Sequence, residues 1–533
     1  MTTVLRSALN TADETFQTNL KHQKQVLAEL DEQIQAAIAG GGPRYQQRHR
    51  DRGRLLVRER IELLLDRDAS FLELSSLAAW GTQFPVGASV VTGIGVVSGV
   101  ECVLIAHDPT VRGGAMNPYS LKKTLRALEI ARINRLPVIN LVESGGADLP
   151  TQSELFVHAG KIFHDLTELS SLAIPTVALV FGNSTAGGAY VPGMCDYAVM
   201  VDGQAKVFLG GPPLVKMATG EDADDEELGG AAMHAKVSGL CDYFAADERD
   251  CIRIGRQIVA EFTWRKLGPG PSLPADEPLY DPEELLGIAP SDIKVPFDPR
   301  EVIARVVDGS RFGEYKPLWG TSLVTGWASV HGYPVGILAN ARGVLFSEEA
   351  KKASEFIQLA NQTDTPLLFL QNTTGYMVGK NYEQGGIIKD GSKMINSVAN
   401  SKVPHITVNL AASFGAGNYG MSGRAYDPRL MFAWAGSKLA VMGAAQLAGV
   451  MSIVAKQSAA ANGREFDLEA DERNRAAIEA QIEKESHAFF VTARLYDDGL
   501  IDPRDTRTVL GIALSAAHSN IVAGQRGYGV FRM

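Results

Sequence analysis

The sequence lacks an excess of positive charge, a dense set of cysteines and any long apolar run. Its 51 lysines and arginines are outnumbered by 61 acidic residues, and the net charge of −10 argues against a nucleic acid or an anionic membrane as the main partner. Its 4 cysteines form no C-x-x-C pair, so we expect reduced core thiols. No apolar run approaches the roughly 18 residues of a membrane helix. The polar start, residues 1–19, has no signal-peptide core, and we expect the cytoplasm or a mitochondrial matrix.

Several catalytic signatures are also absent. There is no G-x-S-x-G elbow, no H-E-x-x-H, no G-x-x-x-x-G-K-[ST] phosphate loop and no zinc-spaced cluster of cysteine and histidine, so we expect no metal. Gly93, Gly95 and Gly99 loosely resemble a dinucleotide fingerprint, but they lie in a hairpin pattern and not before a helix. The acidic run 221–227 offers no histidine at ligand spacing and is interpreted as a solvent-facing loop or helix start.

One short stretch occurs twice. Residues 184–190 read S-T-A-G-G-A-Y after an apolar, strand-like run, and residues 413–419 read S-F-G-A-G-N-Y after a similar run. The sequence offset that carries Ser184 to Ser413 also carries Pro175 to Pro404 and Gly146 to Gly375, and we call it the common offset. One unit of a strand and a glycine turn is therefore used twice, and we expect two halves of an active site.

The flanking patterns predict the same order of elements in both copies. In the first copy we expect a hairpin over 90–108, a helix over 120–134, a strand over 138–142, a helix over 154–172 and a strand over 176–181. In the second copy we expect a hairpin over 323–339, a helix over 348–361 and strands over 367–370 and 406–410. An amphipathic helix over 11–38 precedes them, and helices over 467–487 and 510–523 close the chain.

A chain of 533 residues is too long for one hydrophobic core, which favours several domains. The stretch 268–298 is rich in proline and glycine and is typical of a linker. We therefore expect an N-terminal helical segment over 1–75, a first domain over 76–267, this linker, and a second domain over 299–533. The fold class is α/β.

Small residues directly after a strand suggest chemistry carried by the main chain. Paired glycines, or alanine and glycine, leave consecutive N–H groups unobstructed, and a following helix adds positive potential. Two such groups aimed at one oxygen make an oxyanion hole. The alternative is that these glycines only allow close packing of a helix, and the duplication in one register favours the oxyanion hole.

A basic tract over 44–60 carries seven arginines in an acidic protein. It fits either a solvated helix face balanced by nearby acids or a phosphate-binding segment. The residues alone leave both interpretations open.

At this point the chain resembles, over nearly its whole length, a known family: the β, or carboxyltransferase, subunits of biotin-dependent acyl-CoA carboxylases. It looks most like the methylcrotonoyl-CoA carboxylase type. The strings that carry the resemblance are R-G-R-L-L-V-R-E-R-I at 52–61, K-K-T-L-R-A-L-E-I-A at 122–131, S-T-A-G-G-A-Y-V-P at 184–192, G-G-P-P-L-V-K-M-A-T-G-E at 210–221, S-F-G-A-G-N-Y-G-M at 413–421, G-R-A-Y-D-P-R at 423–429 and G-Y-G-V-F-R-M at 527–533.

The resemblance implies two tandem crotonase-like (ClpP/crotonase) domains with β-β-α superhelical cores. It also implies that the amides of Gly187 and Gly188 hold the thioester carbonyl of an acyl-CoA, while those of Ala416 and Gly417 hold the ureido oxygen of biotin. Enolates held in these two pockets would carry the carboxyl group from carboxybiotin to the acyl-CoA, without a side-chain base. The residues expected to bind substrate are Arg52, Arg54, Arg58, Gly145, Gly146, Ala186, Tyr190, Lys216, Gly375 and Phe414.

The resemblance further implies partners. The chain has no biotin-attachment string of the A-M-K-M kind and no ATP-grasp signature, so biotin would arrive on a separate biotin carboxylase and carrier α subunit. A homo-oligomer, a hexamer of six β subunits with sites between the first domain of one and the second domain of another, is expected. A biotin-dependent acyl-CoA decarboxylase subunit and a non-catalytic scaffold subunit remain as alternatives.

Two segments depart from the methylcrotonoyl pattern. Residues 113–118 read G-G-A-M-N-P where that type tends to have G-G-T-Y-Y-P, and residues 156–161 look shorter than their counterpart. Both could shape the acyl pocket, which leaves open whether the substrate is a branched unsaturated, straight-chain or terpenoid acyl-CoA.

Overall fold

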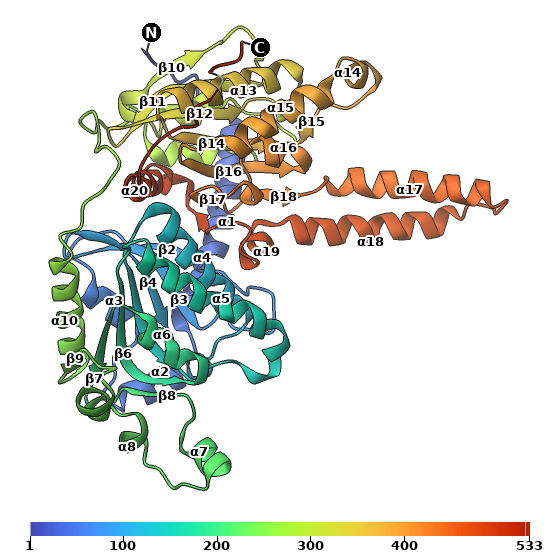
Figure 1. The fold of residues 1–533 in the computed structure, drawn as a ribbon. Coiled ribbons are helices and arrows are strands. Elements are labelled where there is room, and N and C mark those ends of the chain that lie inside the picture. The colour runs from blue at the N-terminus through green and yellow to red at the C-terminus, as the bar shows by residue number, and fades with distance from the viewer. Residues whose placement is uncertain (1, 528, 533) are drawn as a thin grey trace.

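The computed structural model describes residues 2–527 and 529–532, so Tyr528 and Met533 of the closing motif lie outside the described residues. The chain forms two halves, each built on one mostly parallel sheet, which are stacked one above the other in Figure 1. The repeated α/β units predicted from the sequence are both present.

The first half contains a sheet of 8 strands in the order β2-β3-β4-β5-β6-β7-β9, with β8 paired to β6. Its strands are β2 (Leu72–Leu74), β3 (Val90–Val97), β4 (Val100–His107), β5 (Val138–Ser144), β6 (Thr176–Thr185), β7 (Tyr197–Val201), β8 (Lys206–Phe208) and β9 (Tyr243–Ala245). Its helices include α2 (Pro43–Arg50), α3 (Val57–Leu64), α4 (Pro118–Asn134), α5 (Gln152–Ser171), the turn η3 (Ala186–Ala189), α6 (Tyr190–Met194), α7 (Pro212–Thr219), α8 (Asp225–Gly229), α9 (Ala231–Met233) and α10 (Glu248–Glu261).

The second half contains a sheet of 9 strands in the order β1-β10-β11-β12-β14-β16-β17-β19, with β18 paired to β16. Its strands are β1 (Thr3–Val4), β10 (Arg311–Tyr315), β11 (Leu323–Val330), β12 (Tyr333–Asn340), β14 (Leu367–Thr373), β16 (His405–Phe414), β17 (Leu430–Trp434), β18 (Lys438–Ala440) and β19 (Leu500–Ile501); β13 (Val344–Leu345) pairs with β15 (Gly375–Tyr376). Its helices include α11 (Leu285–Ile288), α12 (Pro299–Ala304), α13 (Ser347–Gln362), α14 (Lys380–Gln384), α15 (Ile387–Asn400), α16 (Gly415–Gly420), α17 (Ala444–Ala461), α18 (Leu468–Ser486), α19 (Ala488–Ala493) and α20 (Thr506–Ala517).

The two halves repeat each other down to the register of their strands. Strands β5 and β6 run parallel, with an irregularity that ends in the pair Ser144 and Ser184. Strands β14 and β16 have the same irregularity and end in Thr373 and Ser413, at the common offset that the sequence predicted. The prediction of a duplicated unit is therefore confirmed.

A buried lysine is repeated as well. Lys123 on α4 donates from Nζ to the carbonyls of Gly87 and Val90, and Lys352 on α13 donates to those of Gly320 and Leu323. Burial lowers the pKa of each ammonium group to about 8. Each lysine thereby fixes a helix to the start of the first strand of its hairpin.

The halves are joined by an apolar core and by one buried carboxylate. A single cluster of buried apolar side chains runs from Leu74 in the first sheet to Trp434 and Ile501 in the second half. Asp498, which is fully buried, accepts hydrogen bonds from the Arg126 guanidinium of α4 at 2.8 and 2.9 Å and from Arg424 at 3.2 Å. The relative placement of the halves therefore depends on an ion pair inside the protein as well as on apolar packing.

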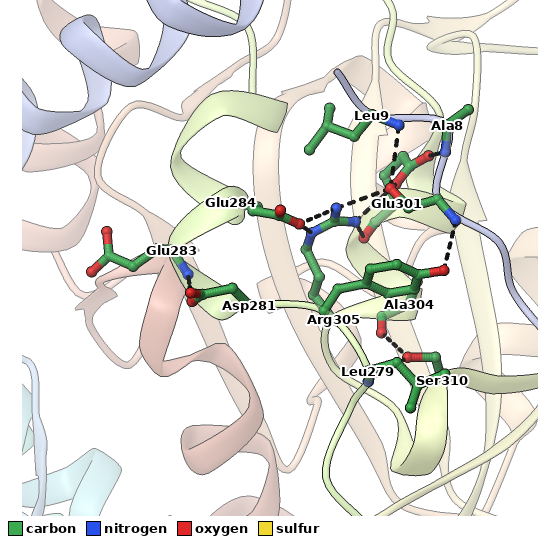
Figure 2. A network of polar contacts seen from close by, with 12 residues as sticks. Ala8, Leu9, Leu279, Asp281, Glu283, Glu284, Glu301, Ala304, Arg305 and Ser310 are labelled. Atoms are coloured by element: carbon green, nitrogen blue, oxygen red, sulfur yellow. Dashed lines mark hydrogen bonds and ion pairs between the residues drawn. The ribbon is translucent and has the colours of Figure 1, made fainter. Parts of the chain in front are cut away.

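Residues 2–39 and the predicted linker both pack on the second half, whereas α2, α3 and β2 of the expected N-terminal segment belong to the first half. Helix α1 (Glu14–Ala39) lies against α11, and β1 adds to the edge of the second sheet at β10. Figure 2 shows Arg305, which is 1% exposed and pairs with Glu284 and Glu301. The Glu301 carboxylate also accepts from the backbone N–H of Ala8 at 2.8 Å. The stretch 268–298 is thus fixed in place, with Leu285 and Leu286 in the core.

Each half sends out an arm directly beside its glycine turn. Strand β8 pairs with the last three residues of β6, and β18 pairs with the last three of β16. After these short strands the chain leaves the sheet, as α7 and α8 in the first half and as the long hairpin of α17 and α18 in the second (Figure 1). The second arm exposes the apolar side chains Val450, Met451, Ile453 and Val454.

The structure shows the state of the cysteines and the character of the helices. All 4 cysteines are free thiols, of which Cys195 is half-buried and the others are buried. No helix among the described residues combines the length and the apolar character needed to cross a membrane.

The carboxyl of Asp497 makes the junction of the halves sensitive to pH. Burial, reinforced by the charge of Asp498, raises the pKa of Asp497 to about 7. A carboxyl with a raised folded pKa contributes stability that is fully present below its unfolded pKa of about 3.9 and is lost as the pH rises through the folded value. We therefore expect Asp497→Asn to raise the apparent melting temperature at pH 8 by ~3 °C, and to raise it by a smaller amount at pH 5.

The matched control is Asp498→Asn, which removes the partner of Arg126 and Arg424 and lowers the melting temperature at both pH values. Differential scanning calorimetry of the two variants measures both effects. Equal melting temperatures for Asp497→Asn and the unmodified protein at pH 8 would contradict the raised pKa.

Candidate active site

Each half places a tight glycine turn at the carboxyl end of a central strand. Strand β6 enters η3 through Ala186, and β16 enters α16 through Gly415, both with φ of +55°. A left-handed conformation costs free energy at alanine and little at glycine. The strained Ala186 indicates that this turn geometry is required at the end of β6.

The turn after the neighbouring strand lies directly beside it. Gly146 follows β5 with φ of +91°, and a Cβ atom there would lie 3.2 Å from the carbonyl oxygen of Thr185. Gly375 follows β14 with φ of +124°, and its Cβ position is 3.9 Å from the carbonyl oxygen of Phe414. The structure therefore brings together the turns that the sequence predicted as substrate-binding segments, Gly145 and Gly146 with Ala186, and Gly375 with Phe414.

The backbone N–H groups of the two turns lie where a helix leaves donors without partners. Gly187 is the second residue of η3, and Ala416 and Gly417 are the second and third residues of α16. The first N–H groups of a helix have no acceptor within the helix, and its dipole places positive potential there. The N–H of Gly145, by contrast, donates to the carbonyl of Gly113 at 2.9 Å.

The chain itself does not explain why positions 187 and 188 are glycine. Neither residue has a positive φ, and a Cβ atom would make only ordinary contacts, at 3.6 Å from Phe163 and from Ser184 Oγ respectively. Gly417 is different, because its Cβ would lie 2.6 Å from Thr373 Oγ1. Glycine at 187 and 188 therefore leaves space for something outside the chain, whereas Gly417 is required by packing.

Different side-chain hydrogen bonds hold the two glycine turns in place. In the first half, Ser184 Oγ donates to the carbonyl of Gly188 at 2.8 Å. In the second half, Ser413 Oγ donates to Gln371 at 2.7 Å and accepts from Asn418 at 2.8 Å. All of these hydrogen bonds are buried or nearly so, which makes each turn rigid.

The basic tract is mostly committed to ion pairs inside the first half. Arg60, which is 1% exposed, pairs with Glu143 at 2.7 Å and with Glu248 at 2.8 Å, and Arg54 also pairs with Glu143. Burial would raise the pKa of Glu143, but the charges of Arg60 and Arg54 lower it overall. Glu143 lies next to Ser144 at the end of β5, directly before the glycine turn. By holding Glu143, Arg54 and Arg60 fix the strand end from which this turn begins.

Two of the three arginines predicted to bind substrate are therefore occupied. Arg58 makes a bidentate pair with Glu73 at 2.7 and 2.9 Å, and Arg54 is held by Glu143. Arg52 is exposed, and its guanidinium, like that of Arg48, forms no ion pair with any residue that the structure describes. Lys216, on the exposed α7 arm, pairs with Asp222 at 2.5 Å.

Arg48 and Arg52 line a cavity of about 420 Å³ in the first half. The cavity also contains Arg112 and reaches Gly113, the residue that accepts the N–H of Gly145. Its positive charge is suited to a polyanionic group.

Apolar surface adjoins each turn. Tyr190 is 44% exposed and packs on Phe163 with ring centroids 5.4 Å apart, and Phe156 of the same helix α5 is 83% exposed. In the second half, Ala416 lines a cavity of about 250 Å³ together with the apolar residues Tyr376, Met377, Val378, Ile387, Ile388 and Ile395. The sequence did not predict this cavity, since its residues carry no motif.

Comparisons with known proteins agree on one family. A model described as the carboxyl transferase domain matches residues 48–527. The chain is 65% identical to a probable biotin-dependent acyl-coenzyme A carboxylase beta2 subunit of Mycobacterium tuberculosis, covering 95% of this chain and 96% of that protein. It is 49% identical to the biotin-dependent 3-methylcrotonyl-coenzyme A carboxylase beta1 subunit of the same organism, covering 96% and 97%. Among solved structures, the geranyl-CoA carboxylase beta subunit of P. aeruginosa matches with a TM-score of 0.89 and 42% identity over 100% of both chains.

The ion-pair network predicts different roles for neighbouring arginines. We expect Arg60→Leu to lower the free energy of unfolding by about 3–5 kcal/mol, because it leaves Glu248 buried without a cation and Glu143 with Arg54 as its remaining partner. The control Arg52→Ala removes an exposed side chain and changes this free energy by less than about 0.5 kcal/mol. Urea-induced unfolding followed by circular dichroism measures both, and equal losses in the two variants would contradict a structural role for Arg60.

Proposed function

The chain belongs to the carboxyl transferase family and is the carboxyltransferase subunit of a biotin-dependent acyl-CoA carboxylase, and we propose that it carboxylates a 3-methylcrotonoyl-type acyl-CoA through enolates held by its two glycine turns. The match over the full chain also confirms the tandem crotonase-like fold that the motifs implied. The observation that carries the proposal is the pair of equivalent turns, one in each half, whose amides lie at the start of a helix.

The first turn is proposed to hold the acyl-CoA. The thioester oxygen becomes negatively charged when the adjacent acyl group loses a proton, and the amides of Gly187 and Gly188 would stabilise this charge. The space left by glycine at both positions supports the assignment, because a side chain there would block the oxygen. Tyr190 and the apolar face of α5 lie beside this turn and would contact the acyl group.

The second turn is proposed to hold the ureido group of biotin. Biotin comes on the partner α subunit as a substrate of this chain and supplies both the carboxyl group and a nitrogen base. The fit rests on three features: the amides of Ala416 and Gly417 at the start of α16, the small side chain of Ala416, and the apolar cavity next to it. These amides would stabilise negative charge on the ureido oxygen when the carboxyl group leaves.

The reaction balances without a catalytic side chain. The C–N bond of the carboxylated ureido group would break to release CO2, the freed nitrogen would take a proton from a carbon of the acyl chain, and that deprotonated carbon would form a C–C bond with CO2. The chain's own part is to hold both oxygens and to exclude water. A side-chain base is unnecessary, which is consistent with turns that are lined by glycine, alanine, serine and threonine.

The cavity lined by Arg48 and Arg52 is proposed to take the phosphates of coenzyme A. Arg112 also lines it but pairs with Asp148 at 3.3 Å. The cavity adjoins Gly113, whose carbonyl accepts the N–H of Gly145 in the turn after β5. This turn lies beside the turn that carries Gly187 and Gly188, so a thioester bound there would place its nucleotide near the cavity. Arg54, Arg58 and Lys216 are weaker candidates, because acidic partners already occupy them.

The substrate class follows from two relatives whose named acyl groups share one chemistry. The 3-methylcrotonyl and geranyl groups are both 3-methyl-2-enoyl thioesters, and the chain is 49% and 42% identical to the corresponding subunits. We propose a branched 3-methyl-2-enoyl-CoA, with 3-methylcrotonoyl-CoA first, which is consistent with leucine catabolism. A hexamer of this subunit, paired with a biotin carboxylase and carrier α subunit in the cytoplasm or a mitochondrial matrix, completes the proposal.

A panel of thioesters tests the activity. The protein, its α subunit, ATP and bicarbonate are mixed with 3-methylcrotonoyl-, geranyl-, propionyl- and acetyl-CoA, and incorporation of labelled bicarbonate is measured. We expect the highest kcat/KM for 3-methylcrotonoyl-CoA. Failure of the intact complex to carboxylate any of the four would overturn the proposed function, and a preference for propionyl-CoA would overturn only the substrate class.

A single uncharged substitution can remove the backbone N–H donor of Gly188. Gly188→Pro eliminates the N–H, and we expect kcat to fall by about 10²–10³-fold, the usual cost of losing one oxyanion-hole donor. Gly188→Ala keeps the N–H but adds a side chain, so comparing the two variants separates loss of the donor from the steric effect, and we expect a smaller fall in kcat for alanine than for proline. Gel filtration checks assembly of both. Activity of the proline variant within tenfold of the unmodified protein would show that this amide is not a donor.

A further inference from the structure

The two hydroxyl groups that end the strands before the glycine turns occupy equivalent places. Ser144 is the last residue of β5 and Thr373 is the last residue of β14, and they are separated by the common offset that relates the halves. Both side chains are buried, at 5% and 0% exposed. Neither belongs to a sequence motif that the function has so far explained.

Each hydroxyl makes the same two hydrogen bonds. Ser144 Oγ donates to the carbonyl of Gly114 at 2.8 Å and accepts from the N–H of Gly146 at 3.2 Å. Thr373 Oγ1 donates to the carbonyl of Gly343 at 3.2 Å and accepts from the N–H of Gly375 at 3.2 Å. A carbonyl can only accept and an N–H can only donate, so the direction of each bond is fixed.

These bonds add a side-chain link between two segments that are also paired through their backbones. Gly114 and Gly343 lie in the loops that lead into α4 and α13, whereas Gly146 and Gly375 lie in the turns after β5 and β14. The loop and the turn are also joined by backbone bonds, such as Gly145 N–H to Gly113 in the first half and Thr374 N–H to Gly343 in the second. Glycine has the largest conformational freedom of any residue, so these turns depend on such bonds for a fixed position.

The fixed turn in each half lies against the amide-bearing turn. A Cβ added to Gly146 would lie 3.2 Å from the carbonyl oxygen of Thr185, the residue before η3. In the second half the equivalent distance, from Gly375 to the carbonyl oxygen of Phe414, is 3.9 Å, but Thr373 Oγ1 and Gly375 Cα lie 2.6 and 2.9 Å from the position that a Cβ on Gly417 would occupy. A displacement of Thr373 would therefore disturb the packing against Gly417, and a displacement of Ser144 would disturb the position of Gly146 beside Thr185.

We propose that Ser144 and Thr373 are positioning residues for the two oxyanion holes, with Ser144 acting on the acyl-CoA side and Thr373 on the biotin side. This inference rests on the proposed function. An oxyanion donor must lie within about 2.7–3.1 Å of the charged oxygen, and a misplacement of about 1 Å costs on the order of 10²-fold in rate. A single hydroxyl that ties the turn to its supporting loop provides this precision in both halves.

The test uses the complete complex of this chain with its α subunit, and two pairs of variants. Ser144→Ala and Thr373→Val remove a hydroxyl, while Ser144→Thr and Thr373→Ser exchange the residue types that the two halves already use. We expect each removal to lower kcat by about 10–100-fold with little change in the KM for the acyl-CoA, because the binding of its nucleotide is untouched. The exchanged variants should recover kcat to within about threefold of the unmodified complex, since they keep the hydroxyl.

An isotope effect separates positioning from a loss of folded protein. With acyl-CoA deuterated at the carbon that is carboxylated, Ser144→Ala should show a larger isotope effect on kcat than the unmodified complex, because removal of the proton becomes slower. A purely structural role would lower the melting temperature and the fraction of active sites, and would leave this isotope effect unchanged. Thr373→Val, which is nearly equal in volume to threonine, gives an independent test should Ser144→Ala fold poorly.

The outcomes distinguish this inference from the function on which it rests. An unmodified complex that carboxylates no thioester overturns the proposed function. An active unmodified complex with kcat for Ser144→Ala and Thr373→Val within twofold of it overturns only the positioning roles, as does a failure of Ser144→Thr and Thr373→Ser to recover the rate.

Discussion

The site depends on the parallel pairing of two neighbouring strands in each half. Because the strands of the pair run in the same direction, both end at the same edge of the sheet, and their shared irregularity brings Ser144 beside Ser184 and Thr373 beside Ser413. Two glycine turns then leave that edge side by side. If the register slipped by one residue, buried and exposed side chains would exchange faces and the turns would separate. The backbone amides are therefore placed by the sheet itself.

The halves keep this geometry with different supporting chemistry. Below the first turn lies a charged network, in which Glu143 is held by Arg54 and Arg60 and the latter continues to Glu248. In the second half the equivalent residue is Asn372. Its backbone N–H donates to the side-chain oxygen of Asn340. A charged support lies close to the cavity proposed for the phosphates of coenzyme A, and a neutral one lies under the turn proposed for the ureido ring. The two halves thus share the geometry of their glycine turns, while the residues that support these turns differ.

Much of this could be predicted from the sequence, because strands, helices and glycine turns are encoded locally. The repeat at the common offset located β5, β6, β14 and β16 and the turns that follow them. The roles of the arginines could not be predicted, since Arg60 meets Glu143 and Glu248, which lie far from it in the chain. The helix predicted over 467–487 is α18, whereas α17 was missed. The buried lysines and the hydroxyls of Ser144 and Thr373 were missed because their roles lie in contacts between distant segments. A polar residue just before a glycine turn, repeated at the common offset, was the signal that could have indicated the two hydroxyls.

We propose that main-chain amides hold both charged oxygens. The decisive measurement is a structure of the complex with a non-reactive acyl-CoA analogue and biotin. We expect the thioester oxygen to lie within about 3.1 Å of the amide nitrogens of Gly187 and Gly188. The ureido oxygen should lie equally close to the amide nitrogens of Ala416 and Gly417. Oxygens contacted only by side chains, or a thioester seated on the second turn, would contradict this proposal.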